Sequence, residues 1–204
     1  MDRLKTINCH AGKLPFYQGR NVLNWALIND EKEFGVTVHY VDEGIDTGDI
    51  IFQNSYPINE SDSYHSLLER AYEGCAQTLY ASIKQIQSNQ VKLIPQKSIH
   101  AFGFYCIQRR PGDEILSWHQ SSRNVFNCIR AICLPGPQAR TFFGKVELRL
   151  NKVEFIPDAK TYIGIPGSVL HVAKDSFCVK TLETYVHVIE WSGENTPRIG
   201  DRLQ

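Results

Sequence analysis

Three side chains that suit acyl-transfer chemistry are introduced by a strand end and by a glycine-bearing turn. Asn8 and His10 lead into a Gly/Pro-punctuated loop, and Asp46 lies in the turn Gly44-Ile45-Asp46-Thr47-Gly48. An amide can polarise a carbonyl oxygen, an imidazole can handle a proton, and a carboxylate can orient the imidazole. Each residue taken alone also fits a plain strand end or turn, and no spacing rule links position 10 to position 46. The trio is therefore a hypothesis for the attack of an amine on an acyl carbon.

The other candidate residues are less specific. Trp25, in a short helix beside the loop, fits equally well as a core anchor and as a stacking partner for a substrate. Arg109 and Arg110 could bind a phosphate through paired hydrogen bonds, although a solvated pair in a linker is the simpler interpretation. Four further histidines do not stand at metal-ligand spacing and are interpreted as surface or core residues: His39, His65, His171 and His187. No metal is therefore predicted.

Composition and charge favour an ordinary globular protein. The 204 residues are 42% hydrophobic and 22% charged, with a formal net charge of zero, so no overall field attracts nucleic acid or an anionic membrane. The half after residue 95 carries an excess of about four positive charges, which could favour a phosphate-bearing substrate. The chain shows no secretory segment and no membrane-spanning apolar run, and its six cysteines form no Cys-x-x-Cys pair. We therefore expect a cytoplasmic protein with reduced, mostly buried thiols and no membrane partner.

The elements that must position the trio are typical of an α/β layer. Hydrophobic periodicity predicts strands over residues 4–8, 34–41 and 50–58, a loop over 9–20, and a short helix over 21–30. The clearest helix is predicted over 63–88. Its apolar face is expected to consist of residues at three- and four-residue steps: Leu68, Tyr72, Cys75, Leu79, Ile83 and Ile86.

A second, β-rich domain is predicted after a linker. We expect a first domain over residues 1–95, a linker over 96–111 and a second domain over 112–204. The second domain would begin with a helix over 121–133 that buries Val125, Ile129 and Ile132. Closely spaced strands suggest a small barrel or open sheet, with strands over residues 140–143, 145–150, 168–173, 176–182 and 185–191.

Several motifs, in this order, resemble the folate-dependent formyltransferase family. They are the Asn8-Cys9-His10 strand end, the Leu14-Pro15-Phe16-Tyr17-Gln18-Gly19 loop, Gly35-Val-Thr-Val-His39 and the Asp46-Thr47-Gly48 turn. The family includes enzymes that formylate methionyl-tRNA, glycinamide ribonucleotide and nucleotide-linked amino sugars. The resemblance implies the C-terminal part of a Rossmann-like core followed by a small OB-like domain. It also implies that Asn8, His10 and Asp46 are catalytic.

The resemblance further implies a co-substrate and its binding residues. The co-substrate would be 10-formyltetrahydrofolate, with its pterin held by the turn residues Val41, Asp42, Glu43, Gly44 and Asp46, and with no metal. The run Leu23-Asn24-Trp25 resembles the branch that acts on nucleotide-linked amino sugars. The residues expected to bind the acceptor substrate lie in the loop, the short helix and the linker: Tyr17, Gly19, Arg20, Asn24, Trp25, Arg109 and Arg110.

We therefore expect formyl transfer to the amine of a nucleotide-linked amino sugar, by an enzyme that could be a homodimer. A methionyl-tRNA formyltransferase is the alternative, although it would need a strongly basic C-terminal module. In the family, further Rossmann strands precede the Asn-x-His strand and form one wall of the folate pocket, whereas only seven residues precede Asn8. A third alternative is accordingly an inactive fragment that acts only as a binding or assembly module.

Overall fold

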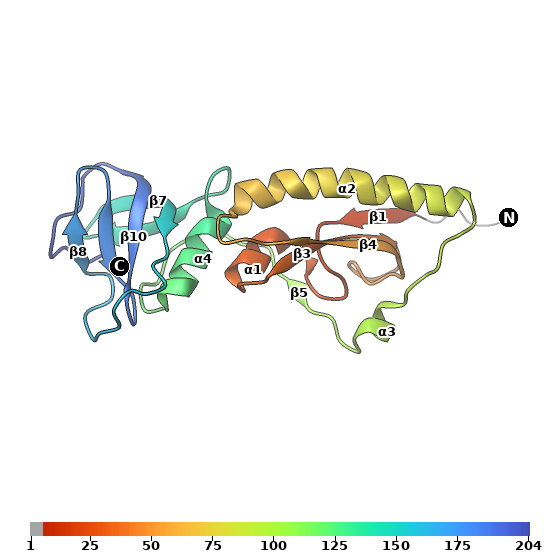
Figure 1. Ribbon diagram of the computed structural model, residues 1–204, viewed down its shortest axis with the longest axis horizontal. Coiled ribbons are helices and arrows are strands. Elements are labelled where there is room, and N and C mark those ends of the chain that lie inside the picture. The colour runs from red at the N-terminus through yellow and green to blue at the C-terminus, as the bar shows by residue number, and fades with distance from the viewer. Residues whose placement is uncertain (1–5) are drawn as a thin grey trace. The chain divides into compact units, whose positions relative to one another are not determined.

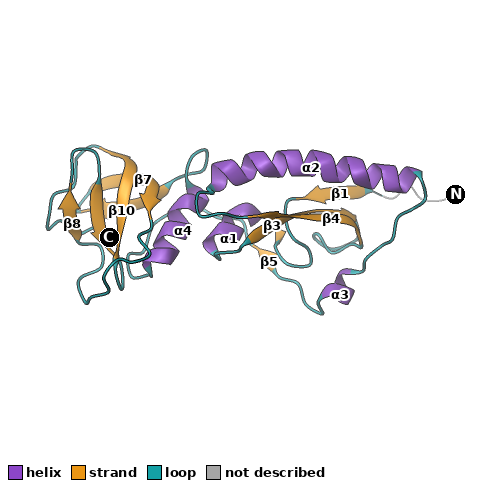
Figure 2. Cartoon of the chain, in the orientation of Figure 1, coloured by secondary structure: helices purple, strands orange, loops and turns teal. Residues whose placement is uncertain are grey.

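The computed structural model describes residues 6–204. Contacts divide the chain into two compact units. The first contains residues 1–26, 31–62 and 66–109, and the second contains 27–30, 63–65 and 110–204. Each unit combines helices with a sheet (Figures 1 and 2), so the predicted α/β class with a β-rich C-terminal part is confirmed.

The first unit is built on a three-stranded sheet in the order β1-β3-β4. Its strands are β1 (Ile7–His10), β3 (Glu33–Tyr40) and β4 (Ile50–Pro57). The predicted second and third strands are confirmed. The first strand was predicted over residues 4–8, whereas β1 begins at Ile7 and ends at His10. Residues 4 and 5 of the predicted strand lie outside the described residues. Six consecutive residues of β3 are buried, as is typical of a strand covered on both faces.

Both neighbouring strand pairs of this sheet are antiparallel, whereas a Rossmann-like core is mostly parallel. Strands β3 and β4 are antiparallel because the turn between them is short, and a parallel connection needs a crossover of a dozen or more residues. The antiparallel register places Asn8 opposite His39 and His10 opposite Thr37. This register brings side chains of two strands to one site.

Helix α2 (Tyr64–Gln87) matches the predicted helix in length, but the predicted apolar face is wrong. Tyr72 on that face is 67% exposed. The buried face is instead composed mainly of small residues: Leu67, Ala71, Gly74, Thr78 and Ser82. Small side chains let the helix approach β4 closely: a Cβ on Gly74 would lie within 3.0 Å of the Tyr56 ring, and Asn54 donates a hydrogen bond to Thr78 over 3.1 Å.

The segment predicted as a linker belongs largely to the first unit. It contains the single-turn helix α3 (Gln96–Ile99) and the short strand β5 (Tyr105–Cys106). Strand β5 pairs in parallel with β2 (Gln18–Gly19), inside the region predicted as a loop. Helix α1 (Val22–Ile28) follows directly, as predicted. The chain after residue 95 therefore returns to the loop that follows β1.

The second unit contains helix α4 (Ser122–Ile132) and a five-stranded antiparallel sheet in the order β6-β7-β10-β9-β8. Ser121 caps the helix by accepting a hydrogen bond from the backbone of Asn124, and Val125, Ile129 and Ile132 are buried as predicted. The five strands agree with the predicted ones: β6 (Ala139–Phe143), β7 (Val146–Glu154), β8 (Val169–Val172), β9 (Phe177–Lys180) and β10 (Tyr185–Gly193). Within residues 6–204, no helix is both long enough and apolar enough to cross a membrane.

Candidate active site

The strand order and one unusual turn bring the predicted trio together. Asn8 and His10 are two positions apart on β1, so they share a face of the sheet. The turn after β3 returns Asp46 to that face, where it adopts a positive φ of 56°. A carboxylate-bearing residue tolerates this left-handed conformation better than most side chains do. Its carboxylate can therefore enter the site from the turn.

The carboxylate of Asp46 is the centre of the arrangement. Its Oδ1 accepts a hydrogen bond from the Asn8 side-chain amide over 3.2 Å, and its Oδ2 accepts one from the backbone N–H of Gly19 over 2.9 Å. The Nδ1 atom of His10 lies 3.7 Å from Oδ2, and the Nε2 atom of His39 lies 3.4 Å from Oδ1. One carboxylate thus lies between two imidazoles and an amide.

His39 is a site residue that the sequence reasoning missed. It is only 2% exposed, which fits a core histidine, but its Nε2 also lies 3.2 Å from the Asn8 amide nitrogen. The signal that could have found it is the pairing of two antiparallel strands, each with a polar side chain on the shared face. Without a register, the sequence could not place His39 opposite Asn8.

Backbone carbonyls indicate the tautomer of both imidazoles. The Nε2 of His10 lies 2.7 Å from the carbonyl oxygen of Tyr17, and the Nδ1 of His39 lies 2.8 Å from that of Tyr40. A carbonyl oxygen only accepts, so each of these nitrogens carries the proton. The nitrogens that face Asp46 are therefore Nδ1 of His10 and Nε2 of His39, and both can accept a proton.

Burial and hydrogen bonding act in opposite directions on Asp46. Burial alone would raise the pKa of its carboxyl group, but hydrogen bonds from His39 and from the Gly19 backbone, with the charges of His10 and His39, lower the pKa to about 2 from an ordinary 3.8. Asp46 is thus ionised throughout the neutral range. It serves as a fixed negative charge beside the imidazoles rather than as a neutral acid.

This lowered pKa predicts an acid-dependent loss of stability. The folded protein binds the Asp46 proton more weakly than the unfolded chain, so the group's stabilising contribution is present above about pH 4 and is lost as the pH falls towards about 2. A shift of this size corresponds to about 2 kcal/mol. Urea unfolding between pH 6 and pH 2 should show that the free energy of unfolding falls more steeply with decreasing pH in wild type than in Asp46→Asn. Parallel curves for the two proteins would contradict the proposed electrostatics.

Two glutamines fix the turn that carries Asp46. The Gln96 side-chain amide donates to the carbonyl oxygens of Asp46 and Gly48 over 2.7 and 2.8 Å, and the Gln18 amide donates to that of Asp46 over 3.2 Å. Both glutamines are buried. The sequence reasoning gave them no role in the site, because no pattern links Gln96 to a turn about fifty residues earlier. Their contacts hold the backbone of the turn while the carboxylate faces the imidazoles.

The residues predicted to hold the pterin form an exposed turn beside Asp46. Val41, Asp42, Glu43 and Gly44 are all exposed. Asp42 stabilises the turn by accepting hydrogen bonds from the Gly44 backbone over 3.1 Å and from the Thr47 hydroxyl over 2.5 Å. The turn is thus shaped by its own side chains, and its exposed residues directly precede Asp46.

The residues predicted to bind the acceptor are only partly gathered at the trio. Tyr17 and Gly19 contact the trio through backbone atoms: the Tyr17 carbonyl bonds to His10, and the Gly19 N–H donates to Asp46. Arg20 and Trp25 instead contact the later segment of the same unit: the arginine donates to Gln108 over 3.2 Å, and the Trp25 indole N–H donates to the carbonyl of Ile107 over 3.1 Å. Trp25 therefore has at least an anchoring role.

The last three predicted acceptor residues are Asn24, Arg109 and Arg110. Asn24 is buried in α1. The backbone N–H of Arg109 donates to Asn21 over 3.0 Å within the first unit, and that of Arg110 donates to Asp113 over 2.6 Å within the second.

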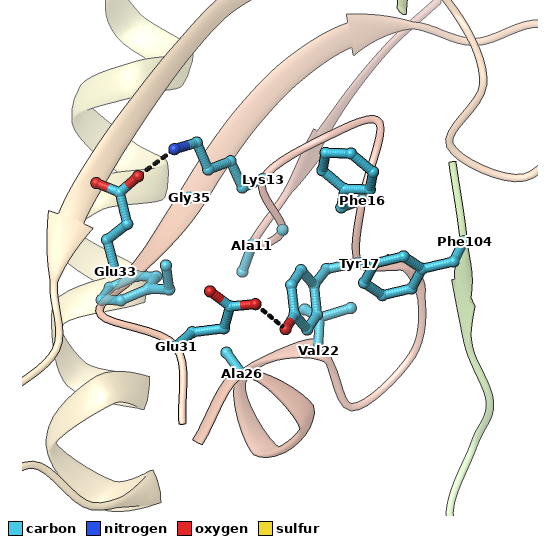
Figure 3. Close-up of a pocket in the computed structure, with 12 residues that line it drawn as sticks. Ala11, Lys13, Phe16, Tyr17, Val22, Ala26, Glu31, Glu33, Gly35 and Phe104 are labelled. Atoms are coloured by element: carbon cyan, nitrogen blue, oxygen red, sulfur yellow. Dashed lines mark hydrogen bonds and ion pairs between the residues drawn. The ribbon is translucent and has the colours of Figure 1, made fainter. Parts of the chain in front are cut away.

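A cavity of about 400 Å³ opens beside the loop that follows His10. Figure 3 shows its aromatic wall and its two carboxylates. The residues that line it are Ala11, Gly12, Lys13, Phe16, Tyr17, Val22, Ala26, Glu31, Glu33, Phe34, Gly35 and Phe104. Its volume is in the range of ligand-binding pockets. Its lining includes Ala11 and Gly12, which directly follow His10 in the chain, but it does not include Asn8, His10 or Asp46 themselves.

All six cysteines are free thiols, and two of them, Cys106 and Cys133, are buried. Cys9 lies between Asn8 and His10, and its thiol donates a weak bond to the Cys75 carbonyl over 3.7 Å. The neighbouring Cys9 thiol lowers the pKa of the Cys75 thiol, although burial acts in the opposite direction. The same contact, together with burial, raises the pKa of Cys9.

Cys75 should consequently react unusually fast for a protein thiol, because the thiolate is the reactive form. We expect Cys9→Ala to slow the alkylation of Cys75 by iodoacetamide at pH 7 by about tenfold. Mass spectrometry of the Cys75 peptide over a pH series measures this rate. Cys178 is an internal control, since burial and the charge of Glu154 raise its pKa. An unchanged rate at Cys75 in Cys9→Ala would contradict the proposed hydrogen bond.

The side chains of residues 6–204 include no cluster of three or more His, Cys, Asp or Glu that could hold a metal ion. The chemistry available to the trio is that of an amide, two imidazoles and a carboxylate. Such groups can position a nucleophile, accept its proton and stabilise negative charge on a carbonyl oxygen.

Two family models match the chain. The model described as "Formyl transferase" matches residues 1–83, and "Formyl transferase, C-terminal domain" matches residues 109–199. Curated relatives include the methionyl-tRNA formyltransferases of Pelotomaculum thermopropionicum, 30% identical over 97% of this chain, and of Caldanaerobacter subterraneus subsp. tengcongensis, 33% identical over 96%. The chain spans 62% of the length of both relatives.

Solved structures share the fold. The N-formyltransferase of Helicobacter canadensis, in complex with folinic acid and dTDP-3-aminofucose, matches 91% of this chain and 66% of its own, with a TM-score of 0.72 and 24% identity. HypX of Aquifex aeolicus, in complex with tetrahydrofolic acid, matches 90% of this chain and 31% of its own, with a TM-score of 0.68 and 23% identity. At these identities the likeness concerns the fold alone.

Proposed function

The chain belongs to the folate-dependent formyltransferase family, and from this we propose that it transfers a formyl group from 10-formyltetrahydrofolate to the amine of a nucleotide-linked amino sugar. The observation that carries the proposal is the Asp46 carboxylate held between His10 and His39 and bonded to Asn8. The bound folate would supply the formyl carbon that the amine attacks. The turn 41–46 is suited to its pterin, because residues 41–45 are exposed and directly precede Asp46.

His10 is the proposed partner of the reacting atoms. Its Nε2 is engaged by the Tyr17 carbonyl, which leaves Nδ1 directed towards Asp46. When Nδ1 is protonated, its N–H can stabilise the negative charge that develops on the formyl oxygen. When Nδ1 is neutral, it can take the proton that the attacking amine loses.

Asn8 is proposed to act through its amide oxygen. Its side-chain nitrogen lies 3.2 Å from the Asp46 carboxylate and 3.2 Å from Nε2 of His39, so it faces the interior of the site. The oxygen of the amide is the atom suited to accept an N–H of the substrate amine and to orient its lone pair.

The neutral charge of the chain supports a small acceptor. The formal net charge is zero, whereas a protein that binds a tRNA backbone gains affinity from many Lys and Arg contacts. Methionyl-tRNA is kept as a second candidate acceptor, because the curated relatives at 30–33% identity are methionyl-tRNA formyltransferases. A cytoplasmic location and a homodimer remain predictions.

The test is a formyl-transfer assay with the purified chain and 10-formyltetrahydrofolate. One arm offers nucleotide-linked 3- and 4-amino sugars, among them dTDP-3-aminofucose, and the other offers methionyl-tRNA. Mass spectrometry detects the added formyl group. Formylated sugar supports the proposal, and formylated methionyl-tRNA with steep salt dependence supports the second candidate. Transfer to neither acceptor would overturn the proposed activity of the chain and favour a binding or assembly role.

A further inference from the structure

The cavity beside the trio has features of a binding site for one part of the acceptor. We propose that it binds the amine-bearing sugar ring, with Glu31 as the residue that recognises the ammonium group before the amine loses its proton. This inference depends on the proposed function for the identity of the acceptor. It adds the location of the acceptor site and the residue that selects an amine.

The first argument for an acceptor site is the position of the cavity relative to His10. The Nε2 of His10 is bonded to the carbonyl of Tyr17, a cavity residue, whereas Nδ1 faces Asp46 of the turn predicted to hold the pterin. A Cβ on the cavity residue Gly12 would lie 2.4 Å from His10 Nε2. The His10 ring does not line the cavity, but it contacts the backbone of two residues that do, Tyr17 and Gly12, and on its other side it faces Asp46. An amine from the cavity and a formyl group from the turn would meet at this ring.

The aromatic wall suits a sugar ring. Tyr17 and Phe104 make an edge contact with centroids 4.9 Å apart, and Phe16 contacts Phe104 at 5.6 Å. Aromatic faces offer apolar surface to the C–H groups of a ring, and their negative π-faces attract a nearby cation. Figure 3 shows Tyr17 and Phe104 along one side of the cavity. This side would stack against the sugar.

The charges in the cavity suit an amine. Its lining contains one lysine and two glutamates, and Lys13 forms an ion pair with Glu33. The lining therefore keeps one net negative charge at Glu31. This carboxylate accepts a hydrogen bond from the Tyr17 hydroxyl over 2.6 Å, which fixes its direction. Figure 3 shows the Glu31 carboxylate directed into the space between Tyr17 and the Lys13–Glu33 pair. A protonated amine there would gain a charge-assisted hydrogen bond.

Glu31→Gln is the decisive substitution. Glutamine keeps the shape of the side chain and can still accept the Tyr17 hydroxyl hydrogen bond, but it removes the charge. We expect the dissociation constant of a nucleotide-linked 4-amino sugar to rise by about tenfold or more, the loss expected for a charge-assisted hydrogen bond. The same sugar with a hydroxyl in place of the amine should bind the two proteins equally. Isothermal titration without folate measures both, so the result does not depend on turnover.

Glu73→Gln is the matched control, because Glu73 is an exposed residue of α2 outside the cavity. Ala26→Leu is a second variant: it fills the cavity from α1 and should weaken both sugars while leaving tetrahydrofolate binding unchanged. Equal affinity of wild type and Glu31→Gln for the amino sugar would overturn the inference, as would the absence of any sugar binding by wild type. Loss of tetrahydrofolate binding in Ala26→Leu would show that the cavity belongs to the donor instead. The proposed function could survive any of these failures, because it is tested separately by formyl transfer.

Discussion

Changing Asp46 to asparagine is expected to reduce kcat for formyl transfer by at least about 1000-fold, with little change in the fold. Asparagine has nearly the same shape as aspartate, so the turn and its hydrogen bonds from Gln96 should persist. What disappears is the negative charge that lies beside the His10 ring and accepts the hydrogen bond of the Asn8 amide. Steady-state kinetics with saturating folate and acceptor, together with circular dichroism, provide the measurement.

Asp49→Asn is the control for this substitution, because Asp49 is an exposed carboxylate three positions further along the same turn. It should retain activity close to that of wild type. His10→Ala should cause a loss as large as that of Asp46→Asn, since the two residues act as one unit and such losses do not add. Near-wild-type turnover from His10→Ala would remove the basis for assigning chemistry to the trio.

Gly12→Ala is expected to lower kcat by about 100-fold although residue 12 is assigned no chemical role. A Cβ at this position would lie 2.4 Å from Nε2 of His10 and 2.5 Å from the carbonyl oxygen of Tyr17. It would therefore separate the two atoms of the hydrogen bond that fixes the ring. Misplacing a catalytic group by about 1 Å can cost this much in rate.

The expected signature of Gly12→Ala is a large fall in kcat with unchanged tetrahydrofolate affinity, measured by kinetics and by titration. Gly74→Ala in α2 is the matched control, because the three atoms nearest to its added Cβ belong to the Tyr56 ring and not to the trio. That variant should keep full activity. If Gly12→Ala were as active as wild type, the hydrogen bond from His10 to Tyr17 could not be what holds the ring in its working orientation.

The sequence predicted the elements around the site well, because their patterns are local. The β-branched run from residue 34 and the apolar steps of the long helix both matched real elements. It failed on the buried face of α2, where close packing against Tyr56 favours Gly74 and Thr78 over the larger neighbouring side chains. The prediction assigned the large apolar residues to the buried face, and that face is wrong.

The trio could be predicted from the sequence, whereas the residues that support it could not. Asn8, His10 and Asp46 were named because their motifs resemble a known family, and the structure brings them together. His39 was interpreted as a surface or core residue, because its role depends on a strand register that no local pattern encodes. Gln96 was assigned to a linker, because its contact with the turn spans about fifty residues. Long-range contacts of this kind are set by the fold as a whole.

The contact of Gln96 with the backbone of Asp46 also sets the order in which the site can be completed during synthesis. The chain emerges from the ribosome with its N-terminus first, so Asn8, His10 and Asp46 are all made before the residue that holds the turn of Asp46. Until α3 has emerged and folded back, the turn of Asp46 lacks its two hydrogen bonds from Gln96. A nascent chain that ends before Gln96 therefore carries every member of the trio and still lacks the finished site.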